Sequence, residues 1–84
     1  MEKPKTIFKE EKLSLSEAQK LIDGHIEIAY DDGKTQIVCN EEGKLFGLPY
    51  NKRATFMWAS LLGGIPNDHL VGDVLILTKK ARLL

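Results

Sequence analysis

Cysteine is nearly absent from this sequence, since Cys39 is the only one among 84 residues. A single cysteine excludes an intramolecular disulfide and a metal cage built from cysteines. Long apolar runs are absent as well, because no stretch approaches the roughly 18–20 residues that cross a bilayer. The first residues, Met1–Lys5, lead into no apolar segment of the kind found in a secretory signal. These absences predict a cytoplasmic protein without membrane contact.

An excess of charge of either sign is also missing. Twelve lysine and arginine residues balance twelve aspartate and glutamate residues, so the formal net charge at pH 7 is zero. Proteins that bind nucleic acid usually carry a basic excess for phosphate contacts, so the composition argues against a nucleic-acid partner. A net charge near zero favours self-association, and a second copy would add buried area that a small core lacks. We therefore expect a homo-oligomer, a dimer or larger.

The length leaves room for one core and no second domain. Residues 1–12 are mostly charged and polar and show little periodicity, so we expect a flexible N-terminal tail there, with room for a short ordered stretch at Ile7–Phe8. The remaining residues, 13–84, are expected to form a single globular domain.

Two short helices are predicted from their capping signals. Ser14 and Glu17 have the spacing of a capping box, which predicts a helix over residues 14–23. Asn51 can cap a second helix over residues 51–62. The apolar stripe of this second helix is Ala54, Met57, Trp58 and Leu61.

A hairpin over residues 25–40 and a buried strand over residues 73–78 complete the outline. Asp32–Gly33 is a strong signal for a two-residue hairpin loop. Val74–Leu77 is a continuous apolar run, typical of a strand buried on both faces. The predicted fold class is α+β, a small antiparallel or mixed sheet packed by two short helices.

The predicted loop fixes a register for the hairpin. It pairs Ile28 with Ile37 and Ile26 with Cys39, because a one-residue slip would invert every side chain. One buried face is then expected to hold Ile26, Ile28, Tyr30, Thr35, Ile37 and Cys39. Replacing Ile28 with alanine is accordingly expected to cost about 2–5 kcal/mol.

No catalytic or metal site is predicted. A cysteine–histidine pair is the first enzyme hypothesis, but the register turns Cys39 toward the core and His25 toward the opposite face. His69 lies in a distant loop. Glu41–Glu42 and Asp31–Asp32 occupy turns, where carboxylates are common without a metal. We expect no cofactor and no enzymatic activity.

The start of the second helix is the candidate binding site. Free backbone N–H groups and the helix dipole favour anions there, and the two cations of Asn51–Arg53 would be offset by an anionic ligand. A solvated helix start explains the same residues equally well. Phe56 points away from the apolar stripe, so it is either scattered surface or, with Tyr50 nearby, part of an interface.

Four blocks of the sequence resemble a small domain family of bacteriophages and mobile elements, the domain of unknown function three-eight-four-six. The resemblance runs from about Ser14 to Leu77, and Asp23 departs from it where the family often has glycine. The blocks are Ile22–Glu27, Asn40–Leu45, Gly47–Ala54 and Val71–Val74. The resemblance implies a phage-type accessory protein acting in the host cytoplasm, and by analogy one that counters host defence.

The leading hypothesis is a non-enzymatic protein that sequesters a small anionic, nucleotide-like signal such as a cyclic dinucleotide. The ligand would lie at a subunit interface, because the chain is too small for a deep pocket. Its expected contacts are Asn40, Lys44, Tyr50, Asn51, Lys52 and Arg53. The alternative is an inhibitor that binds a host defence or transcription enzyme through Phe56. A small hydrolase of such a signal is the second alternative.

Overall fold

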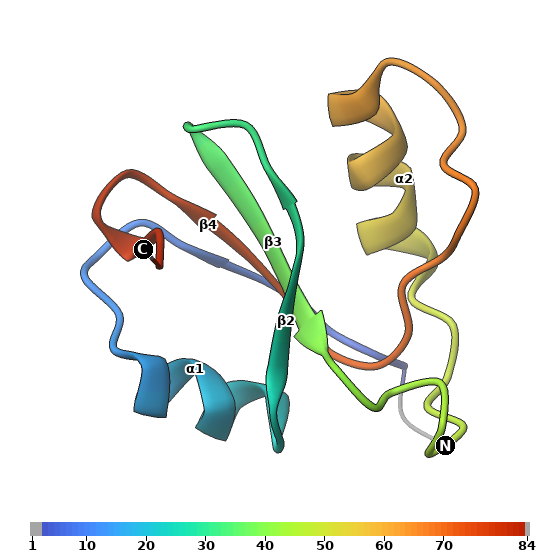
Figure 1. The fold of residues 1–84 in the computed structure, drawn as a ribbon, viewed down its shortest axis with the longest axis horizontal. Helices are drawn as coiled ribbons and strands as arrows, with labels where there is room; N and C mark the ends of the chain where they lie inside the picture. The colour runs from blue at the N-terminus through green and yellow to red at the C-terminus, as the bar shows by residue number, and fades with distance from the viewer. Residues whose placement is uncertain (1–2, 84) are drawn as a thin grey trace.

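The computed structural model describes residues 3–83, which form one four-stranded sheet with a helix on each face (Figure 1). In chain order the elements are β1 (Thr6–Lys9), α1 (Leu15–Ile22), β2 (Ile26–Asp31), β3 (Thr35–Asn40), α2 (Lys52–Leu62) and β4 (Val74–Thr78). The strands lie in the order β1-β4-β3-β2, with β1 parallel to β4 and the other neighbours antiparallel. The predicted α+β class is confirmed. No helix among residues 3–83 is both long and apolar enough to cross a membrane.

α1 begins at the expected capping box. The Ser14 hydroxyl accepts a hydrogen bond from the Glu17 N–H at 3.1 Å, and the Glu17 carboxylate accepts one from the Ser14 N–H at 3.2 Å. Asp23 ends the helix in the left-handed conformation, with φ 61°, and its N–H reaches back to the Lys20 carbonyl. The helix predicted over residues 14–23 is confirmed, with its two caps as the end residues.

The core is divided between the two faces of the sheet. The α1 face is filled by Ala18, Ile22, Val38, Leu75, Leu77 and Ala81. The α2 face is filled by Ile37, Cys39, Ala54, Leu70, Val74 and Ile76. Because a helix covers each side, no side chain of Val74–Leu77 is more than 2% exposed. The strand predicted as buried on both faces is thus confirmed.

The predicted hairpin exists, but its register is wrong. The Asp32 carboxylate accepts hydrogen bonds from the Lys34 and Thr35 N–H groups, which moves the loop one residue on, to Gly33 and Lys34. Tyr30 then pairs with Ile37, and the register shifts again between Ile28 and Tyr30. This β-bulge leaves one residue unpaired and reverses the alternation beyond it.

The bulge separates side chains that were expected to share a face. Ile26 pairs with Asn40, so it lies on the α1 face, whereas Cys39 lies on the α2 face with Ile37. Ile28 follows Ile26 to the α1 face and is 45% exposed near the sheet edge. The large stability loss expected for Ile28→Ala is therefore not supported by this geometry.

The flexible tail predicted over residues 1–12 is wrong at Thr6–Lys9, which form β1 around the short ordered stretch allowed at Ile7–Phe8. Ile7 packs against the α1 face, opposite Leu75 in the parallel register. The segment is short and lies among charged residues. It therefore forms a strand because it pairs with β4, which lies far along the chain. Figure 1 shows this blue strand beside the red β4.

Candidate functional site

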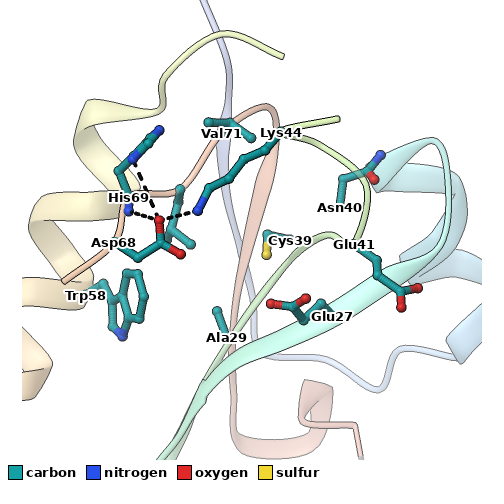
Figure 2. A pocket seen from close by; sticks show the side chains of 11 residues that line it. Glu27, Ala29, Cys39, Asn40, Glu41, Lys44, Trp58, Asp68, His69 and Val71 are labelled. Atoms are coloured by element: carbon teal, nitrogen blue, oxygen red, sulfur yellow. Dashed lines mark hydrogen bonds and ion pairs between the residues drawn. The ribbon is translucent and has the colours of Figure 1, made fainter. Parts of the chain in front are cut away.

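A pocket of about 210 Å³ opens between the β2–β3 hairpin, α2 and the segment that leads into β4 (Figure 2). Its ionisable lining side chains include Glu27, Glu41, Lys44, Asp68 and His69. Pockets that enclose drug-sized ligands measure about 300–1,000 Å³. This one is too small for a dinucleotide and suits at most a molecule of a few heavy atoms.

Lys44, a predicted ligand residue, is already engaged in this pocket. Its ammonium group forms an ion pair with Asp68, whose carboxylate also accepts the His69 N–H at 2.7 Å (Figure 2). The hydrogen bond from Lys44 holds the pKa of Asp68 below its usual value, so the carboxylate stays charged. Glu27 and Glu41 add negative charge to the lining. The pocket therefore repels an anion more than it attracts one.

Cys39 borders the same pocket but has the properties of a core thiol. Its side chain is 8% exposed and packs with Ile37 on the α2 face. Burial, aided by the nearby Glu27 carboxylate, raises the pKa of this thiol to about 11. Little thiolate exists at neutral pH, so the geometry gives no support to a cysteine nucleophile.

The reactivity of Cys39 follows from this pKa. At pH 8 we expect iodoacetamide to alkylate the folded protein at least about 100-fold more slowly than a free thiol, since two pKa units reduce the thiolate fraction about that much. The rate should reach that of a free thiol in denaturant, which serves as the control. Mass spectrometry of timed samples measures both rates, and equal rates in the folded and unfolded protein would contradict the burial.

Asn51 caps α2 but is not a surface ligand residue. It is 1% exposed, and its side-chain oxygen accepts the Ala54 N–H at 3.0 Å. Its amide nitrogen donates to the Gly72 carbonyl at 2.9 Å and to the Lys5 carbonyl at 3.1 Å. Both polar atoms are already used within the chain, so the geometry does not support the predicted phosphate contact. The predicted helix over residues 51–62 is confirmed, with Asn51 as its cap.

Asn40 is also occupied by a structural role. Its side chain is 9% exposed, and its oxygen accepts the Glu42 N–H at 2.8 Å, which shapes the turn after β3. Asn40 pairs with Ile26, so its side chain belongs to the α1 side of the sheet. Asn40 also borders the pocket (Figure 2), but its oxygen is used in this turn, so the geometry gives the predicted ligand contact little support.

The other predicted residues divide into two groups. Tyr50 is 49% exposed and meets the His69 ring edge-on, with 5.4 Å between the ring centroids. It therefore lies with Lys44 and Asp68 beside the pocket. Lys52 and Arg53 point elsewhere, so the single ligand cluster expected from the sequence does not form.

Lys52 lies over an aromatic ring of α2 itself, and Arg53 lies over an aromatic ring of the neighbouring strand β1. The Lys52 ammonium is 5.6 Å from the Phe56 ring centroid, and the Arg53 guanidinium carbon is 5.2 Å from that of Phe8. Phe56 is 60% exposed and Phe8 is 47% exposed. We call these four residues the α2 surface. Phe8 was missed because it lies in the stretch predicted as a tail.

The side chains that could bind a metal ion form no metal centre within the described part of the chain. Among residues 3–83, no three histidine, cysteine, aspartate or glutamate side chains converge at metal-binding distance.

The sequence comparisons give a family but no activity. A family model described as "Domain of unknown function (DUF3846)" matches residues 1–82. The match includes β1, which the resemblance seen in the sequence left out. No curated protein and no solved structure matches the chain.

Proposed function

We propose, from the premise that this chain belongs to the DUF3846 family, whose description assigns no activity, that it is a non-enzymatic binding protein. Its α2 surface binds an acidic protein partner. The observation that carries the proposal is the pair of cations held over exposed rings, Lys52 over Phe56 and Arg53 over Phe8. Such a protein acts by blocking its partner, as the inhibitor hypothesis expects.

The composition of the α2 surface supports a protein partner. Arginine and aromatic residues are enriched in protein interfaces and at their energetic hot spots. Both phenylalanines are exposed apolar side chains on this surface. A cation held over a ring also loses less side-chain freedom on binding than a free one, which lowers the entropic cost of an interface.

The charge of α2 selects an acidic partner. The helix has two cations in its first turn and no acidic residue there. The helix dipole adds partial positive charge at the same end. Lys52 and Arg53 have no ion-pair partner among residues 3–83, so their charge is available to a partner.

A nucleotide-like anion, sequestered between copies of the chain, is the second candidate. It is favoured by the Arg53–Phe8 pair, where a guanidinium for phosphate lies beside a ring that could stack a base. The pocket in Figure 2 gives this candidate no support, because it is small and lined by three carboxylates. Self-association stays a prediction, which sedimentation tests.

The phage context stays a hypothesis from the resemblance. It implies an accessory protein that counters host defence in the host cytoplasm. The one buried free thiol suits the reducing conditions of that compartment.

Removing the central ring of the α2 surface is expected to abolish partner binding. Phe56→Ala should weaken capture of the partner from a bacterial cell extract by at least about thirtyfold, because a hot-spot ring contributes about 2 kcal/mol or more. Arg53→Glu should have a similar effect by reversing charge. Quantitative mass spectrometry of proteins retained on the immobilised variants measures this.

Two exposed residues of α1 provide matched controls on the opposite face of the sheet. Leu15→Ala removes an apolar side chain of similar exposure, 56%, and Lys20→Glu reverses a charge on a helix. Neither should change capture. Equal loss in all four variants, or in none, overturns the proposal. Release of an intact nucleotide that depends on Arg53 and not on Phe56 would favour the second candidate.

A further inference from the structure

β1 presents a free backbone edge beside the α2 surface. It is the outermost strand of the sheet that the structure describes. The Lys5 carbonyl accepts the Val74 N–H at 2.9 Å and the Lys5 N–H donates to the Asp73 carboxylate at 2.8 Å, so both groups of Lys5 face β4. Backbone groups alternate in direction along a strand, so those of Thr6 and Phe8 face outward.

The opposite edge of the sheet is irregular, whereas β1 is regular. β2 carries the bulge between Ile28 and Tyr30, which interrupts the regular ladder that an added strand would need. Its side chains Glu27 and Asp31 are acidic. β1 has a regular register along all four residues and no proline.

We infer that the free edge of β1 receives an extended acidic segment of the partner protein, which pairs with Thr6 and Phe8 as a fifth strand. The inference rests on the proposed function, because the same partner then covers the α2 surface. Strand addition of this kind supplies affinity through main-chain hydrogen bonds and specificity through alternate side chains.

Charge complementarity identifies the added segment as acidic. On the α2 side of β1 it meets the Phe8 ring with the Arg53 guanidinium over it. On the α1 side it meets Ile7, flanked in sequence by Lys5 and Lys9. Opposite charges across a strand pair stabilise it. A segment that alternates acidic and apolar residues fits both sides.

A second copy of this chain fits the same edge less well. An antiparallel pair of β1 strands that joins the outward groups of Thr6 and Phe8 places Lys5 opposite Lys9 twice. Like charges directly opposite each other destabilise a strand pair. The acidic β2 edge of another copy is interrupted by its bulge.

The test uses an end-blocked eight-residue peptide of alternating glutamate and valine, with an alternating lysine and valine peptide as the control. We expect the acidic peptide, and not the basic one, to shift the amide resonances of Thr6 and Phe8. It should slow their hydrogen exchange by at least about tenfold. The amide of Ile7, which faces β4, should be protected with and without peptide.

Two substitutions at one position separate backbone from side chain. Phe8→Pro removes the outward N–H without removing a bond to β4, and Phe8→Ala keeps it. The proline variant should bind the acidic peptide at least about threefold more weakly than the alanine variant does. If Phe8→Pro fails to fold, the amide exchange of the unaltered protein decides alone.

The outcomes separate this inference from the proposed function. Partner capture that needs Phe56, without any change at the Thr6 and Phe8 amides on adding the acidic peptide, overturns the inference and leaves the proposed function standing. Thr6 and Phe8 amides that are already protected without peptide, in a protein that sediments as an oligomer, show that a second copy occupies the edge and also overturn it.

Discussion

Replacing Ile37 with alanine is expected to lower the free energy of unfolding by about 2–5 kcal/mol. Ile37 is fully buried on the α2 face, between Tyr30 on β2 and Ile76 on β4. Loss of its side chain leaves a cavity in the middle of a small core. The neighbouring strands on both sides hold the backbone in place, so the surrounding side chains cannot fill the cavity. Because small domains are stable by only a few kcal/mol, the variant should melt far below the original protein.

Ile28→Ala is the matched control for that experiment, since it removes the same atoms from the neighbouring strand. Ile28 is 45% exposed, so its loss should cost no more than about 1 kcal/mol. Urea unfolding of both variants measures the difference. Similar costs at the two positions would show that the bulge in β2 is absent and that the simple two-residue register holds.

Asn51→Ala is expected to cost about 2–4 kcal/mol, the second large effect. The alanine removes the cap of α2, takes from the Gly72 carbonyl the donor that Asn51 supplies, and leaves the Lys5 carbonyl with the Val74 N–H alone. Thermal unfolding measures the loss, and Lys52→Ala, one residue along on the exposed side, should be nearly neutral.

Asn51→Asp identifies which half of the amide matters. A carboxylate keeps the cap to the Ala54 N–H but faces the two carbonyls with no donor. We expect this variant to be at least as unstable as Asn51→Ala. Stability close to that of the original protein would show that Asn51 acts as a helix cap alone.

The parts of the fold that local signals encode could be predicted from the sequence. Ser14 and Glu17 specify the start of α1 through hydrogen bonds within four residues, and Asn51 does the same for α2. Val74–Leu77 is apolar throughout because both of its faces are covered. In each case the determining contacts lie within the segment or in its composition.

β1 and the hairpin register depend on contacts that the local sequence does not contain. Thr6–Lys9 becomes a strand only by pairing with β4. The bulge at Ala29 lets Ile26 pack under α1 while Tyr30 stays on the α2 face. The alternation of apolar and polar residues in β2 gives no sign of such a shift. The prediction therefore assigned the β2 residues before the bulge to the wrong face of the sheet.

The candidate site was predicted by residue type but not by position. The exposure of Phe56 and its place on the outer side of α2 followed from helical periodicity. The sequence predicted that Lys44 and Arg53 belong to one ligand cluster, but the structure separates them. Lys44 pairs with Asp68, whereas Arg53 lies over Phe8. Both partners come from distant segments whose positions only the folded chain defines.

The parallel pairing of β1 with β4 also determines the order in which the chain can fold. Lys5 and Asp73 are hydrogen-bonded although 68 residues separate them in sequence. The hairpin and the two helices form through contacts that are close in sequence. Pairing β1 with β4 closes a loop that spans nearly the whole chain, which has a higher entropic cost. During synthesis β4 emerges last. We therefore expect β1, although it precedes the other strands in the sequence, to join the sheet after them.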